Sequence, residues 1–220
     1  MKKVSESIWI DSMPLRVGPA ELGARMVVIK LNDGSLVLHS PIELNPSRKQ
    51  HVDKLGNVSA IISPVKTHNL FVGDWLSAYP DASYYKVNEM PVERGGEKEY
   101  FLDNQEKYPW ENDISYVNIG GIPFFNESVF LHKPSKTLIV SDLVFNLHHD
   151  QSMLGGMFLK LNGCYKKFTP SRIFKLQVKN KKDFTESVDK LLQLEFDNVI
   201  MAHGTPVFGG GHALMKSSLS

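Results

Sequence analysis

The sequence lacks the features that mark secreted or membrane-spanning proteins. It contains one cysteine, Cys164, so no internal disulfide can form, and no second thiol or histidine lies beside it to suggest a reactive or metal-binding motif. The apolar stretch from Ile8 to Ile10 is too short for the core of a signal peptide. No apolar run approaches the roughly 18 residues of a membrane span. We therefore expect a cytoplasmic protein with a structural thiol and no membrane partner.

An excess of charge of one sign is also missing. The 25 lysines and arginines nearly balance the 24 aspartates and glutamates, which leaves a formal net charge of +1. Binding to a phosphate backbone usually needs a clear basic surplus. The composition therefore argues against nucleic acid as a partner and favours a small-molecule ligand or substrate.

What the sequence does contain is enough apolar material for one core. The chain has 220 residues, of which 42% are hydrophobic. A folded chain of this size buries about 70% of the surface that its unfolded form exposes. We expect a single domain over residues 1–220 that is stable without a disulfide or a structural metal.

Apolar patterning predicts both strands and helices. An Asp33-Gly34 turn between two apolar runs indicates an early hairpin, and the polar stretch from Lys86 to Asn112 indicates a long surface excursion. The predicted strands are Ile8 to Met13, Arg25 to Leu31, Leu36 to Leu38, Val58 to Ile62, Ile114 to Val117, Ser128 to His132, Thr137 to Ser141 and Asn198 to Ala202. The predicted helices follow Asn45-Pro46, cover Asn69 to Tyr79 and Ser152 to Leu161, contain Phe184 to Leu192 with an Asp183/Glu186 capping box, and cover Ala213 to Leu219. This order predicts an α/β protein with two mixed sheets packed face to face and helices outside.

Three polar residues follow predicted strands directly or after a short loop. His68 comes after Val58 to Ile62, Asp142 after Thr137 to Ser141, and His203 after Asn198 to Ala202. The carboxyl ends of strands are where ligands collect in α/β proteins. Two imidazoles and a carboxylate can bind zinc or iron and leave a coordination position for water. The alternative is that Asp142 caps a turn and the histidines form hydrogen bonds within loops.

Four stretches, taken in order, resemble the metallo-β-lactamase superfamily: 31–38, 58–68, 130–145 and 199–204. His68-Asn69-Leu70-Phe71, followed by Trp75 and Pro80, is similar to an uncharacterised branch of that superfamily known only as a domain of unknown function. The resemblance implies an αββα four-layer sandwich of two mixed β-sheets flanked by helices. It also implies a metal site between the sheet edges, where metal-activated water attacks an ester, amide, thioester or phosphodiester.

The chain departs from the superfamily pattern at most of its metal ligands. The first motif, with two histidines and then Asp-His, falls on Ser63, Val65, Thr67 and His68, so only the last histidine remains. The next histidine of the pattern falls near Phe124. The resemblance therefore implies a reduced ligand set of His68, Asp142 and His203, with Ser63, Thr67 and Phe124 in the pocket.

Two functions from different classes remain open. One is a mononuclear hydrolase of an ester, thioester or phosphodiester that uses one zinc or iron ion. The other is a non-catalytic pseudoenzyme or small-ligand binding module that has lost the metal. His148 and His149 follow Asp142 closely and serve either as a substitute ligand or proton shuttle, or as part of a solvated loop.

Overall fold

The computed structural model describes residues 1–91, 97–105 and 107–219. The chain divides into two compact units that interleave in sequence: unit 1 is Met1–Met13 with Arg25–Asp113, and unit 2 is Pro14–Ala24 with Ile114–Ser220. The expectation of one domain over residues 1–220 stays a prediction. No described helix is long and apolar enough to cross a membrane.

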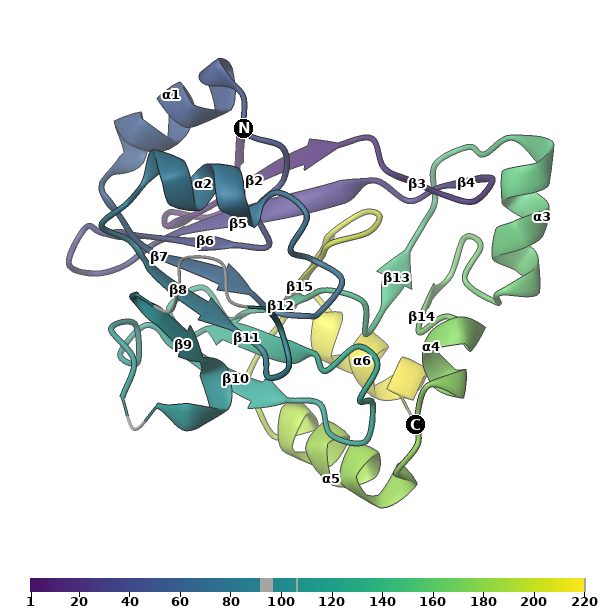
Figure 1. Cartoon of the computed structure of the whole chain (residues 1–220). Coiled ribbons are helices and arrows are strands. Elements are labelled where there is room, and N and C mark those ends of the chain that lie inside the picture. The colour runs from purple at the N-terminus through teal and green to yellow at the C-terminus, as the bar shows by residue number, and fades with distance from the viewer. Residues whose placement is uncertain (92–96, 106, 220) are drawn as a thin grey trace. The chain divides into compact units, whose positions relative to one another are not determined.

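Unit 1 is built on a seven-stranded mixed sheet in the order β1-β2-β5-β6-β7-β8-β9 (Figure 1). The hairpin around Asp33-Gly34 joins β5 to β6 as predicted, and β6 to β9 run parallel to one another. The central strand β7 is almost entirely buried, as its continuous apolar run indicates. The strands are β1 (Lys2–Lys3), β2 (Ile8–Met13), β5 (Ala24–Lys30), β6 (Leu36–His39), β7 (Val58–Ser63), β8 (Ser83–Lys86) and β9 (Glu99–Phe101).

Unit 1 also contains α1 (Pro46–Leu55), α2 (Val72–Ala78) and the 3-10 turn η1 (Leu102–Asn104). Helix α1 begins as predicted, because the Asn45 side chain accepts a hydrogen bond from the Arg48 N–H and Pro46 occupies the first turn. Helix α2 begins three residues later than predicted. Turns close at His68 and again at Val72, and Leu70 is 76% exposed, so it does not belong to the buried stripe.

The predicted surface excursion at 86–112 is wrong in part. Strand β9 pairs with β8, and Lys86, Leu102 and Trp110 are buried. The polar composition of this stretch gave no sign of strand β9, because Lys86 and Glu99 are charged residues whose side chains are nevertheless buried. Residues 92–96 and 106 of the stretch lie outside the described residues.

Unit 2 is built on a five-stranded mixed sheet in the order β10-β11-β12-β15-β16. Its strands β12 and β15 are parallel neighbours, whereas the other pairs are antiparallel. The strands are β10 (Ile114–Asn118), β11 (Ser128–His132), β12 (Thr137–Val140), β15 (Asn198–Met201) and β16 (Val207–Phe208). Two small sheets accompany it, namely β13 (Phe145–Asn146) with β14 (Phe168–Thr169), and β3 (Arg16–Val17) with β4 (Ala20–Glu21).

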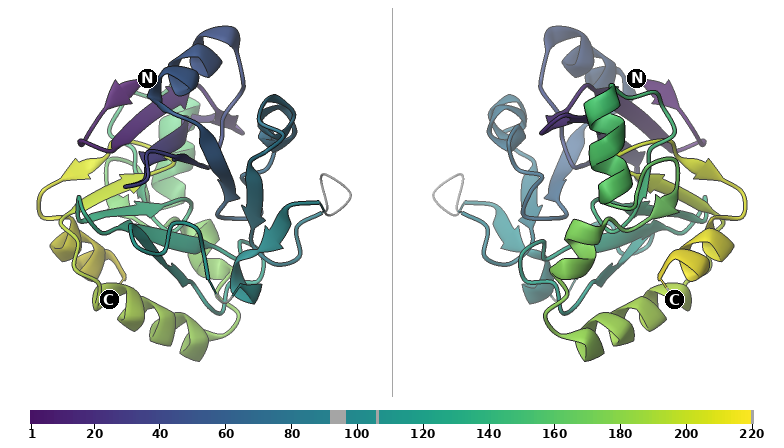
Figure 2. Two further views of the ribbon diagram at one scale, coloured as in Figure 1. Left: turned by 90° about the vertical axis from the view of Figure 1, so that its left-hand side faces the viewer. Right: turned by 90° about the vertical axis from the view of Figure 1, so that its right-hand side faces the viewer.

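Four helices complete unit 2: α3 (Met153–Leu161), α4 (Arg172–Leu176), α5 (Lys181–Leu192) and α6 (Gly211–Leu219). Helices α5 and α6 pack on β10 and β15, whereas α3 packs on β4 (Figures 1 and 2). The predicted capping box of α5 is wrong, because Asn180 caps the helix and accepts hydrogen bonds from the N–H groups of Lys182 and Asp183. Cys164 is buried and unpaired by any disulfide in a small apolar cluster beside α3.

Candidate metal centre

The parallel pairing of β12 with β15 brings Asp142 and His203 together in unit 2. Each residue follows the carboxyl end of its strand by two positions, and the register aligns Val140 with Met201. His203 Nε2 lies 3.1 Å from Asp142 Oδ1, and the side chains are only 5% and 8% exposed. A strand pairing that is set by the core therefore places an imidazole and a carboxylate in contact at a sheet edge.

The Nδ1 edge of the His203 ring contacts the backbone, and one face of the ring contacts Phe145. Nδ1 lies 2.5 Å from the carbonyl oxygen of Gly23, and the Phe145 ring stacks on the imidazole with centroids 5.4 Å apart. A carbonyl oxygen only accepts hydrogen bonds, so Nδ1 carries a proton, and an ionised Asp142 also only accepts. A neutral imidazole would then direct the Nε2 lone pair at a carboxylate oxygen. A metal ion bound by both atoms resolves the conflict, and so does a hydrogen bond from a protonated Asp142 carboxyl group.

The chain after His203 is shaped by Gly204. This residue has φ +99°, a conformation that favours glycine, and a Cβ atom there would lie 2.3 Å from the carbonyl oxygen of Asn146. Asn146 in turn donates from its side chain to the Thr205 carbonyl oxygen at 2.7 Å. The close passage of these two backbones holds the segment that carries His203.

The loop that carries Asp142 is held by a residue that sequence analysis missed. Glu127 is 1% exposed, and its carboxylate accepts hydrogen bonds from the N–H groups of Ser141 at 2.7 Å and Asp142 at 3.0 Å. Burial and the charge of Asp142 raise the pKa of Glu127 to about 8, against the lowering effect of hydrogen bonds from the backbone at Ser141, Asp142 and Leu143. The available sequence signal was a carboxylate directly before the buried strand β11.

His68 lies in unit 1, just beyond β7. Its backbone N–H donates to the Val65 carbonyl oxygen at 3.1 Å, which closes a turn, and its ring is partly exposed. Its Nδ1 lies 2.7 Å from the hydroxyl oxygen of Ser40, a buried residue directly after β6. The parallel neighbours β6 and β7 therefore supply an imidazole and a hydroxyl that orients it.

His39 lies one residue before Ser40 and is almost fully buried. Burial, aided by repulsion from His68, lowers the pKa of the His39 imidazole to about 3. The unfolded chain binds a proton at His39 below about pH 6.5, whereas the folded protein does so only near pH 3. Folding stability from this group is therefore complete above pH 6.5 and falls with acidification.

We expect this histidine to cost about 2 kcal/mol of unfolding free energy between pH 6.5 and pH 5, at about 1.4 kcal/mol per pH unit. Urea denaturation of the wild type and of His39→Leu across that range measures the difference in slope. The variant is expected to lose this part of the acid sensitivity. Parallel pH profiles for the two proteins would show that His39 is not buried in its neutral form.

The predicted pocket residues Ser63, Thr67 and Phe124 occupy three different environments. Ser63 is fully buried at the end of β7, where its hydroxyl accepts a hydrogen bond from the Tyr84 hydroxyl at 2.9 Å. Thr67 is exposed in the turn before His68. Phe124, in unit 2, is 57% exposed and packs edge-to-face on Phe125. The Ser63 hydroxyl therefore takes part in a buried hydrogen bond inside unit 1.

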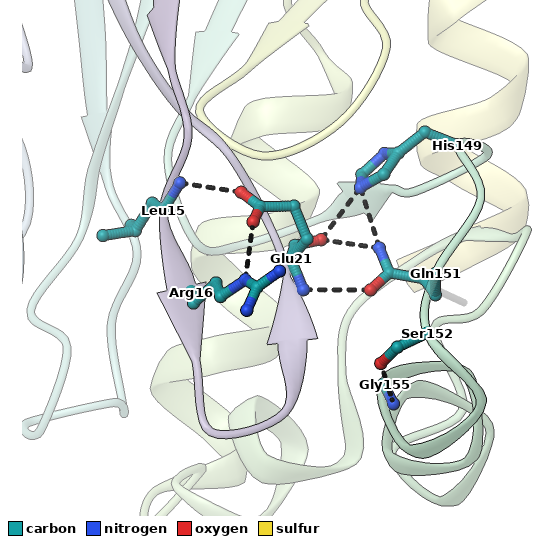
Figure 3. A network of polar contacts seen from close by, with 7 residues as sticks. All are labelled: Leu15, Arg16, Glu21, His149, Gln151, Ser152 and Gly155. Atoms are coloured by element: carbon teal, nitrogen blue, oxygen red, sulfur yellow. Dashed lines mark hydrogen bonds and ion pairs between the residues drawn. The ribbon is translucent and has the colours of Figure 1, made fainter.

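His148 and His149 are both exposed. Figure 3 shows His149 at the β3–β4 hairpin, where its Nε2 lies 2.9 Å from the Glu21 carbonyl oxygen and 2.7 Å from Gln151 Nε2. Gln151 also pairs with both backbone groups of Glu21, and the Glu21 carboxylate binds Leu15 and Arg16. These contacts tie the segment before α3 to the hairpin, which is a structural role.

The fold is that of the metallo-β-lactamases. A metallo-β-lactamase from Pontibacter korlensis aligns with 99% of this chain and 95% of its own length, with a TM-score of 0.64 and 12% identity. The metallo-β-lactamase FIM-1 from Pseudomonas aeruginosa, in its mono-zinc form, aligns over 99% and 93% with a TM-score of 0.63 and 9% identity. A putative diflavin flavoprotein from Nostoc sp. aligns over 98% and 92% with a TM-score of 0.65 and 8% identity.

Within this fold class, the chain belongs to the family described as Domain of unknown function (DUF4336), whose model matches residues 5–157. No curated protein matches the sequence significantly. The resemblance identified from the sequence, to an uncharacterised branch of the metallo-β-lactamase superfamily, is therefore confirmed at the level of fold and family.

Proposed function

We propose that this protein is a metal-dependent hydrolase that binds one divalent ion, zinc or iron, through His68, Asp142 and His203. Each of these residues offers one ligand atom. The observation that carries the proposal is the arrangement at the two histidines. Nδ1 of His68 lies 2.7 Å from the Ser40 hydroxyl oxygen and Nδ1 of His203 lies 2.5 Å from the Gly23 carbonyl oxygen, so each ring is oriented by a contact inside its own unit. Metal-binding histidines typically have such an outer hydrogen bond.

The Asp142–His203 pair supports a cation at the same place. Both residues are almost fully buried, and an ion bound by His203 Nε2 and Asp142 Oδ1 would satisfy both side chains while Nδ1 keeps its contact with the Gly23 carbonyl oxygen. FIM-1 was solved in a mono-zinc form, so this fold accommodates a single zinc ion in at least that protein. One carboxylate neutralises only half of a divalent charge, which leaves the ion electrophilic.

The chemistry assigned to the ion is the usual one for a site with three protein ligands, namely lowering the pKa of bound water towards ~7 and polarising a carbonyl or phosphoryl oxygen. We propose an ester, thioester or phosphodiester as the substrate class. The residues of the chain hold this site in place: Glu127 fixes the Asp142 loop, Gly23 and Phe145 fix His203, and Ser40 fixes His68.

Zinc binding tests the proposal directly. Protein purified without added metal or chelator is subjected to elemental analysis and then, after chelation, to zinc titration. We expect one zinc per chain, and at least about 100-fold weaker binding in His68→Ala, Asp142→Ala and His203→Ala, because loss of a ligand exceeds the 10–100-fold cost of losing an outer partner. The control is His148→Ala, which removes an exposed histidine close to the same loop.

Activity is measured on the same preparations with generic ester, thioester and phosphodiester substrates. Turnover is expected to depend on added metal and to vanish with His203→Ala. A folded protein that binds neither zinc nor iron(II) after their addition would contradict the hydrolase and leave a ligand-binding module. Zinc binding that survives all three substitutions would place the metal elsewhere.

Ser40→Ala tests the outer hydrogen bond separately. We expect zinc affinity to fall about 10–100-fold while the fold is kept, because the imidazole of His68 loses the partner that fixes its orientation. The matched control is Ser77→Ala, which removes an exposed hydroxyl bonded to a helix carbonyl oxygen. Equal zinc affinities for wild type and Ser40→Ala would show that His68 is not a ligand through Nε2.

A further inference from the structure

The near-zero net charge of the chain hides one strongly basic segment. Residues 151–182 of unit 2 contain eight lysines and arginines and no aspartate or glutamate. The rest of the chain carries 17 lysines and arginines against 24 acidic residues, so it is net negative. The basic side chains of the segment, which are all exposed, are Lys160, Lys166, Lys167, Arg172, Lys175, Lys179, Lys181 and Lys182.

The same segment exposes an unusual number of large aliphatic side chains. Met153 is 86% exposed, Leu161 65% and Leu176 73%, and Leu154, Met157 and Ile173 are also exposed. Isolated exposed apolar residues are normal on a protein surface, whereas a group of them indicates a contact surface. Here the group lies among cations.

Helix α3 presents its apolar side chains on a single outer stripe. Met153, Met157 and Leu161 are spaced by four residues and therefore share one face. The opposite face, with Gly155 and Leu159, is buried in unit 2 where α3 packs on β4. Figure 2, right, shows α3 turned toward the viewer with α4 below it on the same side of unit 2. We call the exposed residues of α3, α4 and the loop between them the basic apolar surface.

We propose that the basic apolar surface binds this protein to the surface of an anionic lipid bilayer. Aliphatic side chains would enter the boundary between headgroups and acyl chains, and the lysines would contact the anionic headgroups. The positive charge of the surface favours an anionic partner. The six exposed aliphatic side chains favour a partner that has an apolar layer beneath its charged groups. The expectation of no membrane partner rested on the lack of a spanning segment, which this mode of binding does not require.

Nucleic acid fits this surface less well than lipid does. Single-stranded nucleic acids are held by stacking of bases on exposed aromatic rings. The aromatic residues of the segment are Phe158, Tyr165, Phe168 and Phe174, and each is half-buried or buried. Met153 and Leu176 would gain nothing from a phosphate backbone. The protruding side chains are therefore suited to acyl chains.

A groove beside α4 and α6 could hold a lipid headgroup. It has a volume of about 470 Å³ and is lined by Lys167 and Lys175, with Thr169, Ser217 and Ser218. Lys167 lies in the segment between α3 and α4, and Lys175 lies in α4. A lipid phosphate bound there would lie between two cations while the apolar stripe of α3 contacts the bilayer.

Vesicle co-sedimentation tests the proposal with the full chain. The probes are vesicles of phosphatidylcholine alone and vesicles with about 30 mol% phosphatidylserine, at about 0.1 M and about 0.5 M salt. We expect binding to the anionic vesicles that is at least about tenfold stronger than to the neutral ones and that weakens at high salt. Binding equal for the two vesicle types, or absent from both, would overturn the proposal.

Two variants separate the charge from the apolar contact. Lys160→Glu/Lys167→Glu/Lys175→Glu is expected to lower partitioning at least about tenfold, and so is Met153→Ser/Met157→Ser, which leaves the charge unchanged. The charge-matched control Lys2→Glu/Lys54→Glu/Lys107→Glu changes exposed lysines of unit 1 and is expected to bind within about twofold of wild type. Equal loss in the control, or full binding by the methionine variant, would overturn the proposal. So would displacement from the vesicles by an equal mass of RNA. Circular dichroism confirms that each variant is folded.

Discussion

Glu127→Ala is expected to lower the free energy of unfolding by about 4 kcal/mol. The substitution leaves the buried N–H groups of Ser141 and Asp142 without their acceptor, and each such group costs about 1–3 kcal/mol. It also opens a cavity beside β11, because Glu127 is 1% exposed. Urea denaturation in the presence of chelator measures the stability of the fold alone.

Two further variants identify the cause of this loss. Glu127→Gln keeps one side-chain oxygen as an acceptor, so we expect a smaller loss than for alanine. Glu195→Ala is the matched control, since Glu195 is 86% exposed and only 3.5 Å from Lys136, and we expect a change within about 0.5 kcal/mol. A Glu127→Ala protein within about 1 kcal/mol of wild type would show that the Asp142 loop does not depend on this carboxylate.

Local chemistry predicted most of the fold from the sequence. The Asp33-Gly34 hairpin, the Asn45 cap with Pro46, and the apolar runs of β7 and β15 follow from turn geometry, capping and hydrophobic pattern, and all four are present. Errors occurred at element ends and at short or polar elements, such as strand β9 within the predicted surface excursion. The start of α5 was misplaced because Asn180 caps as well as an aspartate does, and the five-residue helix α4 is too short to show a period.

The sequence predicted only those residues of the candidate site that follow the end of a buried strand. Asp142 and His203 stand out because each follows a buried strand. Glu127 and Ser40 did not stand out, because their roles depend on contacts with residues 14 and 28 positions away. No local pattern encodes such contacts. Ionisable residues inside the core, Glu127 and Lys86 among them, are therefore the part of this protein that composition alone describes least well.

Lys86→Met is expected to lower the free energy of unfolding by about 3–5 kcal/mol, because it leaves the buried Glu99 carboxylate without its counter-charge. Lys86 Nζ lies 2.6 Å from Glu99 Oε2 and 2.6 Å from the Pro91 carbonyl oxygen, and the two side chains are 2% and 3% exposed. The rings of Tyr84 and Phe101 lie 5.4 Å from the same ammonium group, so the pair is surrounded by apolar surface.

The double variant Lys86→Met/Glu99→Leu tests whether the ion pair adds net stability to the fold. The alternative is that each charge is destabilising only when its partner has been removed. Removing both charges abolishes the desolvation cost together with the attraction, so we expect it to recover to within about 2 kcal/mol of wild type. Lys98→Met is the control: Lys98 and Asp81 form a pair on the surface at 3.3 Å, and we expect a loss below about 1 kcal/mol. If the free energy lost by the double variant equals the sum of the losses of its single variants, the coupling energy between Lys86 and Glu99 is zero, and the ion pair does not explain the cost of either substitution.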